Sequence, residues 1–505
     1  MDADGMCMES RPPFRVQPNS TKPLPFHPSD GKSLLNLTTV VSFDGHHVPI
    51  SIYKPVIAGP NTTVPVILHS HGWAGTRATA EDFFIDYVKA GFGVVSIDMR
   101  GHGGASDTSV ARVHRMDFEI KDVQVLIDEI ATWDWVYLDG AGDPRLGAIG
   151  GSYGGAYQLL TAAVDNRLDA IVPQITWNNL PRSLAPNEAP KSAWLDLLYW
   201  GAKATGTSLA PEIDDGYRWV QLVNDFPDGK QPGEPDIRTP FIASSPMSYP
   251  DSINIPTLII QGTSDTLFNL NEGVANYLQI GATGAPVGLV THLNGHIINT
   301  QGTIPASPPQ PVGLQPPAGP DPCGTPTELG IQWFHRYLIG LDVEVPQVCL
   351  AMEDATTLNG TAYPLPGSSM QPFSLGDVTV PVGSKAEAIE VTILEVANRT
   401  VVSGIPHISG SASSPGPDAI VFWTLEVIPA AGERRIINSQ VTPMRLTGSA
   451  EIDMDLMGVG VILDVGDRLV IVASDRNAQY VHNEGRIPGI VTVSGLTLDL
   501  PIVAA

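Results

Sequence analysis

Positively charged residues are scarce in this sequence. There are 28 Lys and Arg against 53 Asp and Glu, which gives a formal net charge of −25 at pH 7. A surface of this sign repels phosphate groups, so nucleic acid and anionic membranes are unsuitable partners. Long hydrophobic runs are also missing, because no stretch reaches the roughly 18 apolar residues of a membrane span. The composition therefore argues against a nucleic-acid-binding or helical membrane protein.

Cysteine is rare, with three in 505 residues. Three cysteines are too few for a disulfide framework and no zinc motif is evident, so we expect no metal and no other cofactor. Cys323 and Cys349 can pair, whereas Cys7 lies apart from them. Residues 1–14 lack the apolar core of a signal peptide. Little lysine and much Gly, Pro, Ser and Thr slightly favour an extracytoplasmic location over a cytoplasmic one.

A chain of this length favours two or three domains. Residues 1–32 are Pro-rich and polar, and we expect an irregular N-terminal arm. Residues 33–342 alternate between strand and helix patterns, which predicts βαβ units, a mostly parallel sheet and an α/β fold. The expected elements are a hairpin (38–43 and 48–53), strands near 64–69, 93–98, 146–149, 170–175, 255–262 and 287–291, and helices over 79–90, 117–131, 271–278 and 327–339.

Two segments interrupt this alternation. Residues 178–253 mix turn-rich and apolar-aromatic stretches between two expected strands, and a long excursion of this kind is typical of a functional lid. We therefore predict an inserted helical cap there. Residues 301–326 are rich in Pro and Gly and are expected to be irregular. From residue 343 to 505, short β-type runs separated by turns replace the helices, which predicts a C-terminal antiparallel β-sandwich domain.

Ser152 is the candidate nucleophile. It follows a strand that begins at Leu146 and precedes a helix, and the segment Gly150–Gly154 fits G-x-S-x-G. In that pattern the serine lies on a strained strand-to-helix turn, where glycines let the backbone pack closely. The alternative is an ordinary Gly-rich turn, because the pentapeptide alone is a weak signal.

A nucleophilic serine needs a base and an acid that orients the base, in the chain order Ser, Asp, His for this kind of sheet. Asp265 follows one expected strand and His296 follows the next, so both face the carboxyl edge of the sheet. Asp265 alone can also be a helix N-cap. His292 competes with His296 on the same loop, and we favour His296 because the Asn294-Gly295 turn gives the loop room to bring it to Ser152.

The backbone N–H groups of Tyr153 and Trp73 are the expected oxyanion donors. The aromatic residues Trp177 and Trp200, at the start and in the middle of the cap region, are candidates for the substrate pocket. His69, His71 and His102 are expected to pack locally rather than to act as base or ligand. The acidic residues of the cap, Glu212, Asp214 and Asp215, form either a solvated face or a site for a substrate ammonium.

The Gly151–Gly155 motif, the inserted cap and the trailing β region together resemble the cocaine esterase and X-Pro dipeptidyl-peptidase (CocE/NonD) family of acyl esterases. The resemblance implies an α/β-hydrolase with a Ser-Asp-His triad beneath a helical cap and a C-terminal jelly roll, with Ser152, Asp265 and His296 in the triad positions. Val465–Leu469 is similar to the turn into a jelly-roll strand. Esterases of the family offer a tyrosine side chain as the second oxyanion donor, whereas this sequence has Gly72-Trp73 there. The backbone amide or the indole of Trp73 must then fill that role.

The sequence therefore predicts a serine hydrolase that cleaves carboxylic esters through an acyl-enzyme. Its expected partner is a small-molecule or polymeric ester. One alternative is an X-prolyl dipeptidyl aminopeptidase or an acylase that acts on amides, for which a buried Glu212, Asp214 or Asp215 facing Ser152 is the discriminating observation. A second alternative is a polymer- or glycan-binding protein with a vestigial hydrolase domain.

Overall fold

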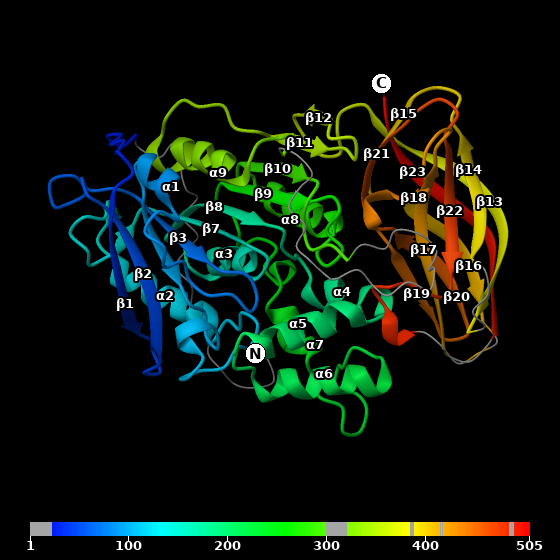
Figure 1. Ribbon diagram of the computed structural model, residues 1–505, viewed down its shortest axis with the longest axis horizontal. Coiled ribbons are helices and arrows are strands. Elements are labelled where there is room, and N and C mark those ends of the chain that lie inside the picture. The colour runs from blue at the N-terminus through cyan, green and yellow to red at the C-terminus, as the bar shows by residue number, and fades with distance from the viewer. Residues whose placement is uncertain are drawn as a thin grey trace.

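The computed structural model describes residues 23–298, 321–383, 388–414, 416, 418–483 and 489–504. The predicted arm lies outside them up to residue 22, and the Pro/Gly-rich segment lies outside them from 301 to 320. Figure 1 shows an α/β part on the left, an all-β part on the right, and helices α4 to α7 below the sheet. No helix among the described residues combines the length and apolarity needed to cross a bilayer.

Among the described residues, ten strands form the central sheet, in the spatial order β1-β2-β4-β3-β7-β8-β9-β10-β11-β12. The strands from β4 to β11 in this order are parallel, and β1, β2 and β12 pair antiparallel at the edges. Their bounds are β1 (Ser33–Val41), β2 (His47–Pro55), β3 (Val66–Ser70), β4 (Gly93–Ile97), β7 (Leu146–Gly151), β8 (Leu168–Gln174), β9 (Thr257–Gly262), β10 (Val287–His292), β11 (Val348–Ala351) and β12 (Thr357–Gly360). A separate two-stranded ribbon joins β5 (Leu138–Gly140) and β6 (Asp143–Pro144).

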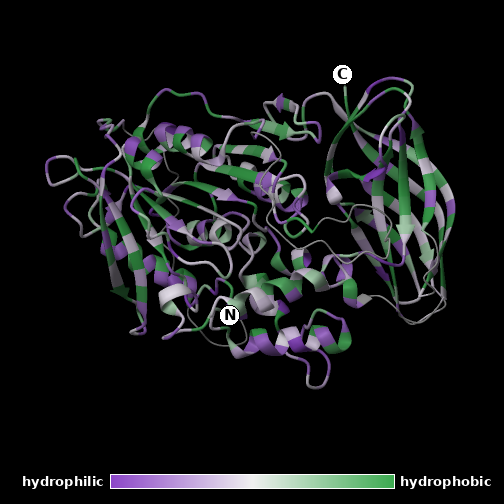
Figure 2. Ribbon diagram, viewed as in Figure 1, coloured by the Kyte–Doolittle hydropathy of each residue, from purple (hydrophilic) through white to green (hydrophobic). Residues whose placement is uncertain are grey.

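Helices cover both faces of this sheet. The helices α2 (Glu119–Ile130), α3 (Tyr153–Val164) and α8 (Leu270–Ala282) pack on one face, against residues such as Val66 and Leu68. The helices α1 (Ile85–Lys89), α9 (Pro326–Phe334) and the π-helix η4 (His335–Ile339) pack on the other, against Ile67. Because both faces are buried, the central strands are continuous apolar runs rather than alternating ones; Figure 2 shows them largely green.

The first helix is shorter than the sequence pattern predicts. A helix was expected over 79–90, but α1 spans only Ile85–Lys89. The preceding residues form turns, in which the N–H of Phe83 donates to Ala80 and that of Ile85 donates to Asp82. The hydroxyl of Tyr53 also donates to the carbonyl of Ala80, at 3.0 Å. Contacts with the sheet therefore fix this segment in a turn before the helix begins.

The predicted domain boundary at residue 343 is wrong. Strands β11 and β12 follow it, yet β11 pairs in parallel with β10 of the central sheet. A disulfide joins Cys323 to Cys349 of β11, with 6.0 Å between the two Cα atoms. The sequence change at 343 marks the end of the helices rather than the end of the sheet. The antiparallel region begins only at β13, which starts at Ser368.

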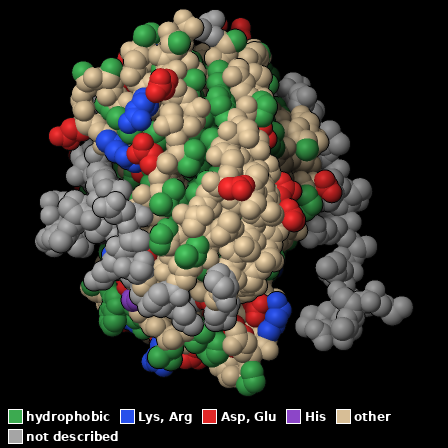
Figure 3. Space-filling model, turned by 90° about the vertical axis from the view of Figure 1, so that its right-hand side faces the viewer, with side chains coloured by type: hydrophobic (Ala, Val, Ile, Leu, Met, Phe, Trp, Pro, Cys, Tyr) green, Lys and Arg blue, Asp and Glu red, His purple; other side chains and the backbone are tan. Residues whose placement is uncertain are grey.

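The C-terminal region consists of two antiparallel sheets. One has the order β20-β16-β23-β15-β21, with β13 paired to β23; the other has the order β14-β22-β17-β18, with β19 paired to β17. Their apolar inner faces form one core, and Figure 3 shows only scattered charges on the outer face. The strands are β13 (Ser368–Val382), β14 (Ile389–Glu395), β15 (Thr400–Gly404), β16 (His407–Ser413), β17 (Ala419–Ile428), β18 (Arg435–Ile436), β19 (Thr442–Leu446), β20 (Ser449–Asp455), β21 (Val459–Leu463), β22 (Arg468–Ser474) and β23 (Gly489–Val503).

Helices fill the excursion between β8 and β9, in the region predicted as a cap. They are α4 (Leu180–Leu184), α5 (Ser192–Ala204), α6 (Pro211–Val223) and α7 (Arg238–Ala243), with short 3₁₀ turns at Pro186–Glu188 and Pro246–Ser248. Helix α6 is amphipathic, and Figure 2 shows hydrophilic and hydrophobic residues alternating along it. Its apolar side, including Val220, is turned toward the rest of the molecule.

Candidate active site

Ser152 forms the turn between β7 and α3. Its φ of 59° and ψ of −122° are a backbone conformation that side-chain-bearing residues rarely adopt. The N–H of Ser152 donates to the carbonyl of Gln174 at 2.9 Å, and Thr176 Oγ1 donates to the carbonyl of Ser152 at 2.9 Å. A Cβ atom on Gly154 would lie 2.2 Å from the carbonyl oxygen of Ser70, so only glycine lets α3 begin this close to β3. This turn places Ser152, which is half-buried, at the carboxyl edge of the sheet.

Asp265 and His296 come from the loops after β9 and β10. The carboxylate of Asp265 is fully buried, and its Oδ1 accepts the N–H groups of Leu267 (2.9 Å) and Phe268 (2.7 Å). Its Oδ2 lies 2.7 Å from Nδ1 of His296. Because an ionised carboxylate only accepts, Nδ1 of His296 carries the hydrogen and Nε2 of the neutral ring is left as a base.

His292 has different contacts from His296. Its Nδ1 accepts the N–H of Asn294 at 3.2 Å, and burial lowers the pKa of His292. Among the described contacts of Asp265, the structure therefore places His296, and not His292, in hydrogen-bond distance of the carboxylate.

The two expected oxyanion donors lie on either side of Ser152. Tyr153 is the first residue of α3, so its N–H points out of the helix N-terminus. The loop with Trp73 follows β3 and passes beside Ser152, since a Cβ on Gly72 would lie 3.9 Å from the Cβ of Ser152. Within the described part of the chain, neither backbone N–H donates to a protein acceptor. The indole N–H of Trp73, in contrast, donates to the carbonyl of Leu198 at 2.9 Å.

A buried histidine that the sequence analysis did not single out supports Tyr153. The ring of His114 stacks on that of Tyr153 with 3.6 Å between centroids, and its Nε2 donates to the carbonyl of Tyr153 at 2.6 Å. Burial lowers the pKa of His114 to about 3, and that of His102, whose ring lies 5.1 Å from Tyr153, also to about 3. Both rings are therefore neutral. Nothing in the local sequence around His114 signals this contact.

The other histidines considered in the sequence make local contacts. His69 Nδ1 lies 2.9 Å from Ser96 Oγ, His71 Nδ1 donates to the carbonyl of Gly72 at 2.7 Å, and His102 Nδ1 donates to the carbonyl of Arg100 at 2.9 Å. In the described residues, no group of three or more His, Cys, Asp or Glu side chains is placed to hold a metal ion.

Ser152 opens into an apolar cavity between the sheet and the cap. Trp73, Tyr153 and Trp177 form the part of the wall that belongs to the α/β fold. The cap contributes most of the remaining wall, with Leu180, Leu184, Leu195, Leu198, Tyr199, Ile213, Tyr217, Val220, Phe226, Ile237 and Phe241, and the loop after Asp265 adds Leu267 and Phe268. No residue described in this wall carries a charge.

The expectation that Trp200 belongs to the pocket is wrong. Its side chain is 60% exposed and it is not among the residues described in the wall. Each residue of an α-helix is rotated by about 100° from the one before, so Tyr199 faces the cavity while Trp200 faces the solvent. Trp177 lies in the wall and is fully buried.

The acidic residues of the cap do not face Ser152. Glu212 lies 3.5 Å from Arg112, Asp214 lies 2.9 Å from Lys203, and Asp215 is 60% exposed and lies 3.6 Å from Arg218. None of the three belongs to the described wall of the cavity. The structure thus places all three in ion pairs rather than in the described wall of the cavity.

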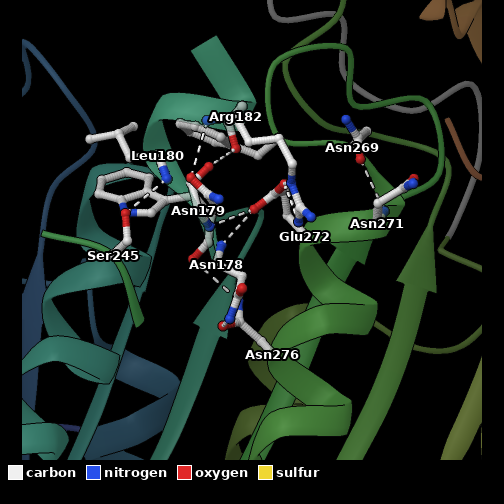
Figure 4. Close-up of polar contacts among 12 residues, drawn as sticks. Asn178, Asn179, Leu180, Arg182, Ser245, Asn269, Asn271, Glu272 and Asn276 are labelled. Atoms are coloured by element: carbon white, nitrogen blue, oxygen red, sulfur yellow. Dashed lines mark hydrogen bonds and ion pairs between the residues drawn. The ribbon is translucent and has the colours of Figure 1, made fainter. Parts of the chain in front are cut away.

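A buried carboxylate, that of Glu272, anchors the start of the cap (Figure 4). Glu272 of α8 accepts the N–H groups of Asn178 (2.8 Å) and Asn179 (2.7 Å) and pairs with Arg182 at 2.9 Å. The side chain of Asn178 also donates to Asn276 at 3.0 Å. These bonds hold Trp177 in the cavity wall.

The fold and the site together define an α/β-hydrolase with a cap and a C-terminal β region. A family model described as X-Pro dipeptidyl-peptidase (S15 family) matches residues 44–302, a little over half of the chain. The chain belongs to this family. This confirms the resemblance of the sequence to the cocaine esterase and X-Pro dipeptidyl-peptidase (CocE/NonD) family. The protein is therefore a hydrolase of the S15/CocE group.

Solved structures with the same architecture cover nearly the whole chain. A CocE/NonD family hydrolase from Staphylococcus aureus is 14% identical with a TM-score of 0.68, and 94% of each chain is covered. An α-amino acid ester hydrolase is 13% identical with a TM-score of 0.61, over 97% of this chain and all of that one. An aminopeptidase from a Thaumarchaeota archaeon gives the same values. At these identities the likeness shows the fold alone.

One curated relative is closer in sequence but matches a smaller part of the chain. The quorum-quenching protein AidA of Acinetobacter baumannii is 32% identical over 151 residues, which are 28% of this chain and 46% of that protein. This chain therefore matches just under half the length of AidA.

Proposed function

We propose that this protein is a serine esterase in which Ser152, His296 and Asp265 form the catalytic triad. The hydrogen bond between Asp265 Oδ2 and His296 Nδ1 carries the proposal, because it leaves Nε2 of His296 as a base at the carboxyl edge of the sheet, where the half-buried Ser152 also lies. The strained backbone at Ser152 supports it, since strain of this kind is concentrated at functional sites.

The proposed reaction has two half-reactions. Ser152 Oγ attacks the ester carbonyl carbon while His296 Nε2 accepts its proton, and the N–H groups of Tyr153 and Trp73 bind the oxyanion. The intermediate collapses as the C–O bond to the alcohol breaks and His296 returns the proton to the leaving oxygen. Water then attacks the acyl-Ser152 carbonyl with His296 as base again, which releases the carboxylic acid and restores the serine hydroxyl. Asp265 orients His296 throughout and stabilises its cation.

The cap favours an ester over an aminoacyl amide. A peptidase that cuts after an N-terminal dipeptide must bind a free ammonium group, and that group needs a carboxylate partner when it is desolvated. The three acidic residues considered for this task pair with Arg112, Lys203 and Arg218 instead. Because these carboxylates already have basic partners, the ion pairs support an ester rather than an aminoacyl amide as the substrate.

The test compares the wild-type protein with Ser152→Ala on a p-nitrophenyl ester and on an aminoacyl-prolyl p-nitroanilide. We expect ester turnover that falls by a factor of about 10⁴ or more in Ser152→Ala and anilide turnover near background. Ser208→Ala, a serine outside the cavity wall, is the control and should keep full activity. Anilide turnover in preference to ester turnover would move the function to a peptidase, and ester turnover that survives Ser152→Ala would overturn the nucleophile.

A further inference from the structure

We infer that the cavity beneath the cap is an acyl pocket, and that the preferred substrates are esters of bulky, uncharged, apolar carboxylic acids. This inference rests on the proposed esterase function and specifies its substrate class.

The wall has little to offer a polar substituent. The hydroxyl of Tyr153 is buried and has no hydrogen-bond partner among the described residues. Three other aromatic side chains of the wall have their polar atoms bonded to the protein: Trp73 Nε1 to Leu198, Trp177 Nε1 to the carbonyl of Ser244 (2.9 Å), and Tyr217 OH to Asp196 (2.8 Å). These rings therefore present carbon to the cavity. A charged group placed there would lose its hydration without gaining a partner of opposite charge among the described residues of the wall.

The position of the cavity assigns it to the acyl side of the ester. Trp73 and Tyr153, whose amides face the carbonyl oxygen in the proposed mechanism, lie in its wall. The leaving alcohol must instead lie beside His296, which protonates it, and His296 is not among the described residues of the wall. The substituent on the carbonyl carbon is therefore the part of the substrate that the cavity encloses.

The experiment measures kcat/KM for p-nitrophenyl acetate, butyrate, hexanoate and benzoate. Burial of each methylene in an apolar pocket should raise kcat/KM by roughly two- to fourfold until the cavity is filled. A second series of acetate esters, with alcohols of increasing length and followed by acid release, should show a much smaller dependence. A preference for long alcohols over long acids would overturn the acyl assignment.

A variant that fills the cavity provides the matched test. Ile213 is half-buried in α6 and lies in the wall, whereas Leu222 of the same helix is 83% exposed. Ile213→Trp should lower the ratio of kcat/KM for the hexanoate to kcat/KM for the acetate by about tenfold or more. Leu222→Trp should leave this ratio unchanged. If Ile213→Trp does not fold, inhibition of the wild type by alkylboronic acids, which add to a nucleophilic serine, should tighten with chain length.

Different results would overturn the acyl pocket and the esterase function. Ser152-dependent turnover that is fastest for acetate would overturn the acyl pocket and leave the esterase standing. No turnover of any ester in either series would overturn both.

A different set of contacts carries a second inference: Gln440 and Lys191 are positioning residues for Asp265. Gln440, from the C-terminal region, donates through Nε2 to the carbonyls of Thr263 (3.0 Å) and Asp265 (2.9 Å). Lys191, at the start of the cap helix α5, donates through Nζ to the carbonyls of Thr266 and Leu267, each at 2.8 Å. Two side chains from outside the α/β fold thus bind four backbone carbonyls, that of Asp265 itself and those of three residues close to it in the loop.

Both side chains are buried, so these bonds are not exchanged with water. Lys191 is 1% exposed and Gln440 is 4% exposed. Burial lowers the pKa of Lys191 to about 8. The negative charges of Asp265 and Glu272 raise this pKa, but their effect is smaller than that of burial. Trp194 of α5 adds a bond from Nε1 to Thr266 Oγ1 at 3.1 Å. The cap and the β region therefore hold the loop whose Asp265 orients His296.

The test replaces Gln440 by Leu and uses Gln479→Leu as the control. Gln479 is also buried in the C-terminal region, but its Nε2 donates to Ser439 (3.3 Å) rather than to the acid loop. Gln440→Leu should lower kcat by about tenfold or more with KM within about threefold, and should shift or broaden the downfield NMR resonance of the His296 Nδ1 proton.

Lys191→Met is the second variant and should act on kcat in the same direction. The inference is overturned if either variant folds and keeps both kcat and the His296 resonance unchanged. It is also overturned if Gln479→Leu, whose side-chain bond does not reach the acid loop, produces the same loss as Gln440→Leu.

Discussion

The indole of Trp73 donates a hydrogen bond to the backbone carbonyl of Leu198, 2.9 Å away. This bond connects the loop after β3 to the cap helix α5. It also occupies the indole N–H of Trp73, which the sequence analysis considered as a possible oxyanion donor. The backbone N–H of Trp73 is then the donor that remains beside Ser152.

Trp73→Phe tests that assignment. The substitution keeps the backbone N–H and an aromatic wall but removes the indole N–H, so we expect kcat to fall by less than about tenfold. Loss of a true oxyanion donor costs about 10²–10³ in kcat. A fall of that size in steady-state kinetics on p-nitrophenyl acetate would show that the indole itself binds the oxyanion.

His296→Ala and His292→Ala form a matched pair on one loop. We expect the first to lower kcat by about 10⁴ or more, since it removes the base of the triad. The second removes a histidine whose Nδ1 accepts a bond from Asn294, and kcat should stay within about tenfold of the wild type. The opposite ranking would make His292 the base.

Asp265→Asn preserves the shape of the side chain but not its charge. An amide at this position can donate to Nδ1 of His296, which favours the wrong tautomer of the ring, and the corresponding change in serine proteases lowers kcat by about 10⁴. We expect a loss of about 10³–10⁴ here, measured at saturating ester. Asp215→Asn, which breaks an exposed ion pair with Arg218, is the control and should keep its activity.

Buried histidines make the protein less stable in acid. Burial lowers the pKa of His69, His102 and His114 to about 3 each, so between about pH 3 and 6.5 the unfolded chain binds more protons than the folded one. The free energy of unfolding therefore falls as the pH falls through this window. Burial raises the pKa of Glu119 to about 7. Between about pH 4.5 and 7 this carboxyl binds more protons in the folded chain than in the unfolded one, so its contribution to the free energy of unfolding rises as the pH falls.

Urea unfolding of the wild type and His102→Gln at several pH values measures this effect. Removing one such histidine should reduce the slope of the unfolding free energy against pH by up to about 1.4 kcal/mol per pH unit. An unchanged slope would mean that His102 is protonated in the folded state.

The disulfide between Cys323 and Cys349 should stabilise the end of the sheet. It closes a loop across a sequence separation of 26 residues that contains α9, and such a cross-link contributes about 3–4 kcal/mol in the chain-entropy model. Cys323→Ser with Cys349→Ser should lower Tm by several degrees in calorimetry without changing KM. A Tm equal to that of the wild type would contradict this contribution.

The features that could be predicted from the sequence are those that depend on the order of residues within one strand, helix or turn. The strand–helix alternation predicted the parallel sheet because each strand and helix buries its own apolar residues, and the glycines around Ser152 indicated the turn. The sequence did not indicate the short α1 or the two strands after residue 343, because contacts with the rest of the sheet decide both.

The supporting residues were missed for the same reason. His114 contacts Tyr153 across 39 residues, and Gln440 contacts Asp265 across 175. Neither has a neighbour in sequence that marks its role, so only the folded chain brings them to the site. Trp200 was misplaced because an apolar-aromatic run does not reveal which residue of a helix turns inward.

The most direct test of the account is the site of covalent labelling by a fluorophosphonate, located by peptide mass spectrometry in the wild type and in His296→Ala. We expect one label per chain, on Ser152, and much slower labelling of the variant because the serine has lost its base. Labelling of a different serine, or ester turnover by a protein whose Ser152 stays unlabelled, would contradict it.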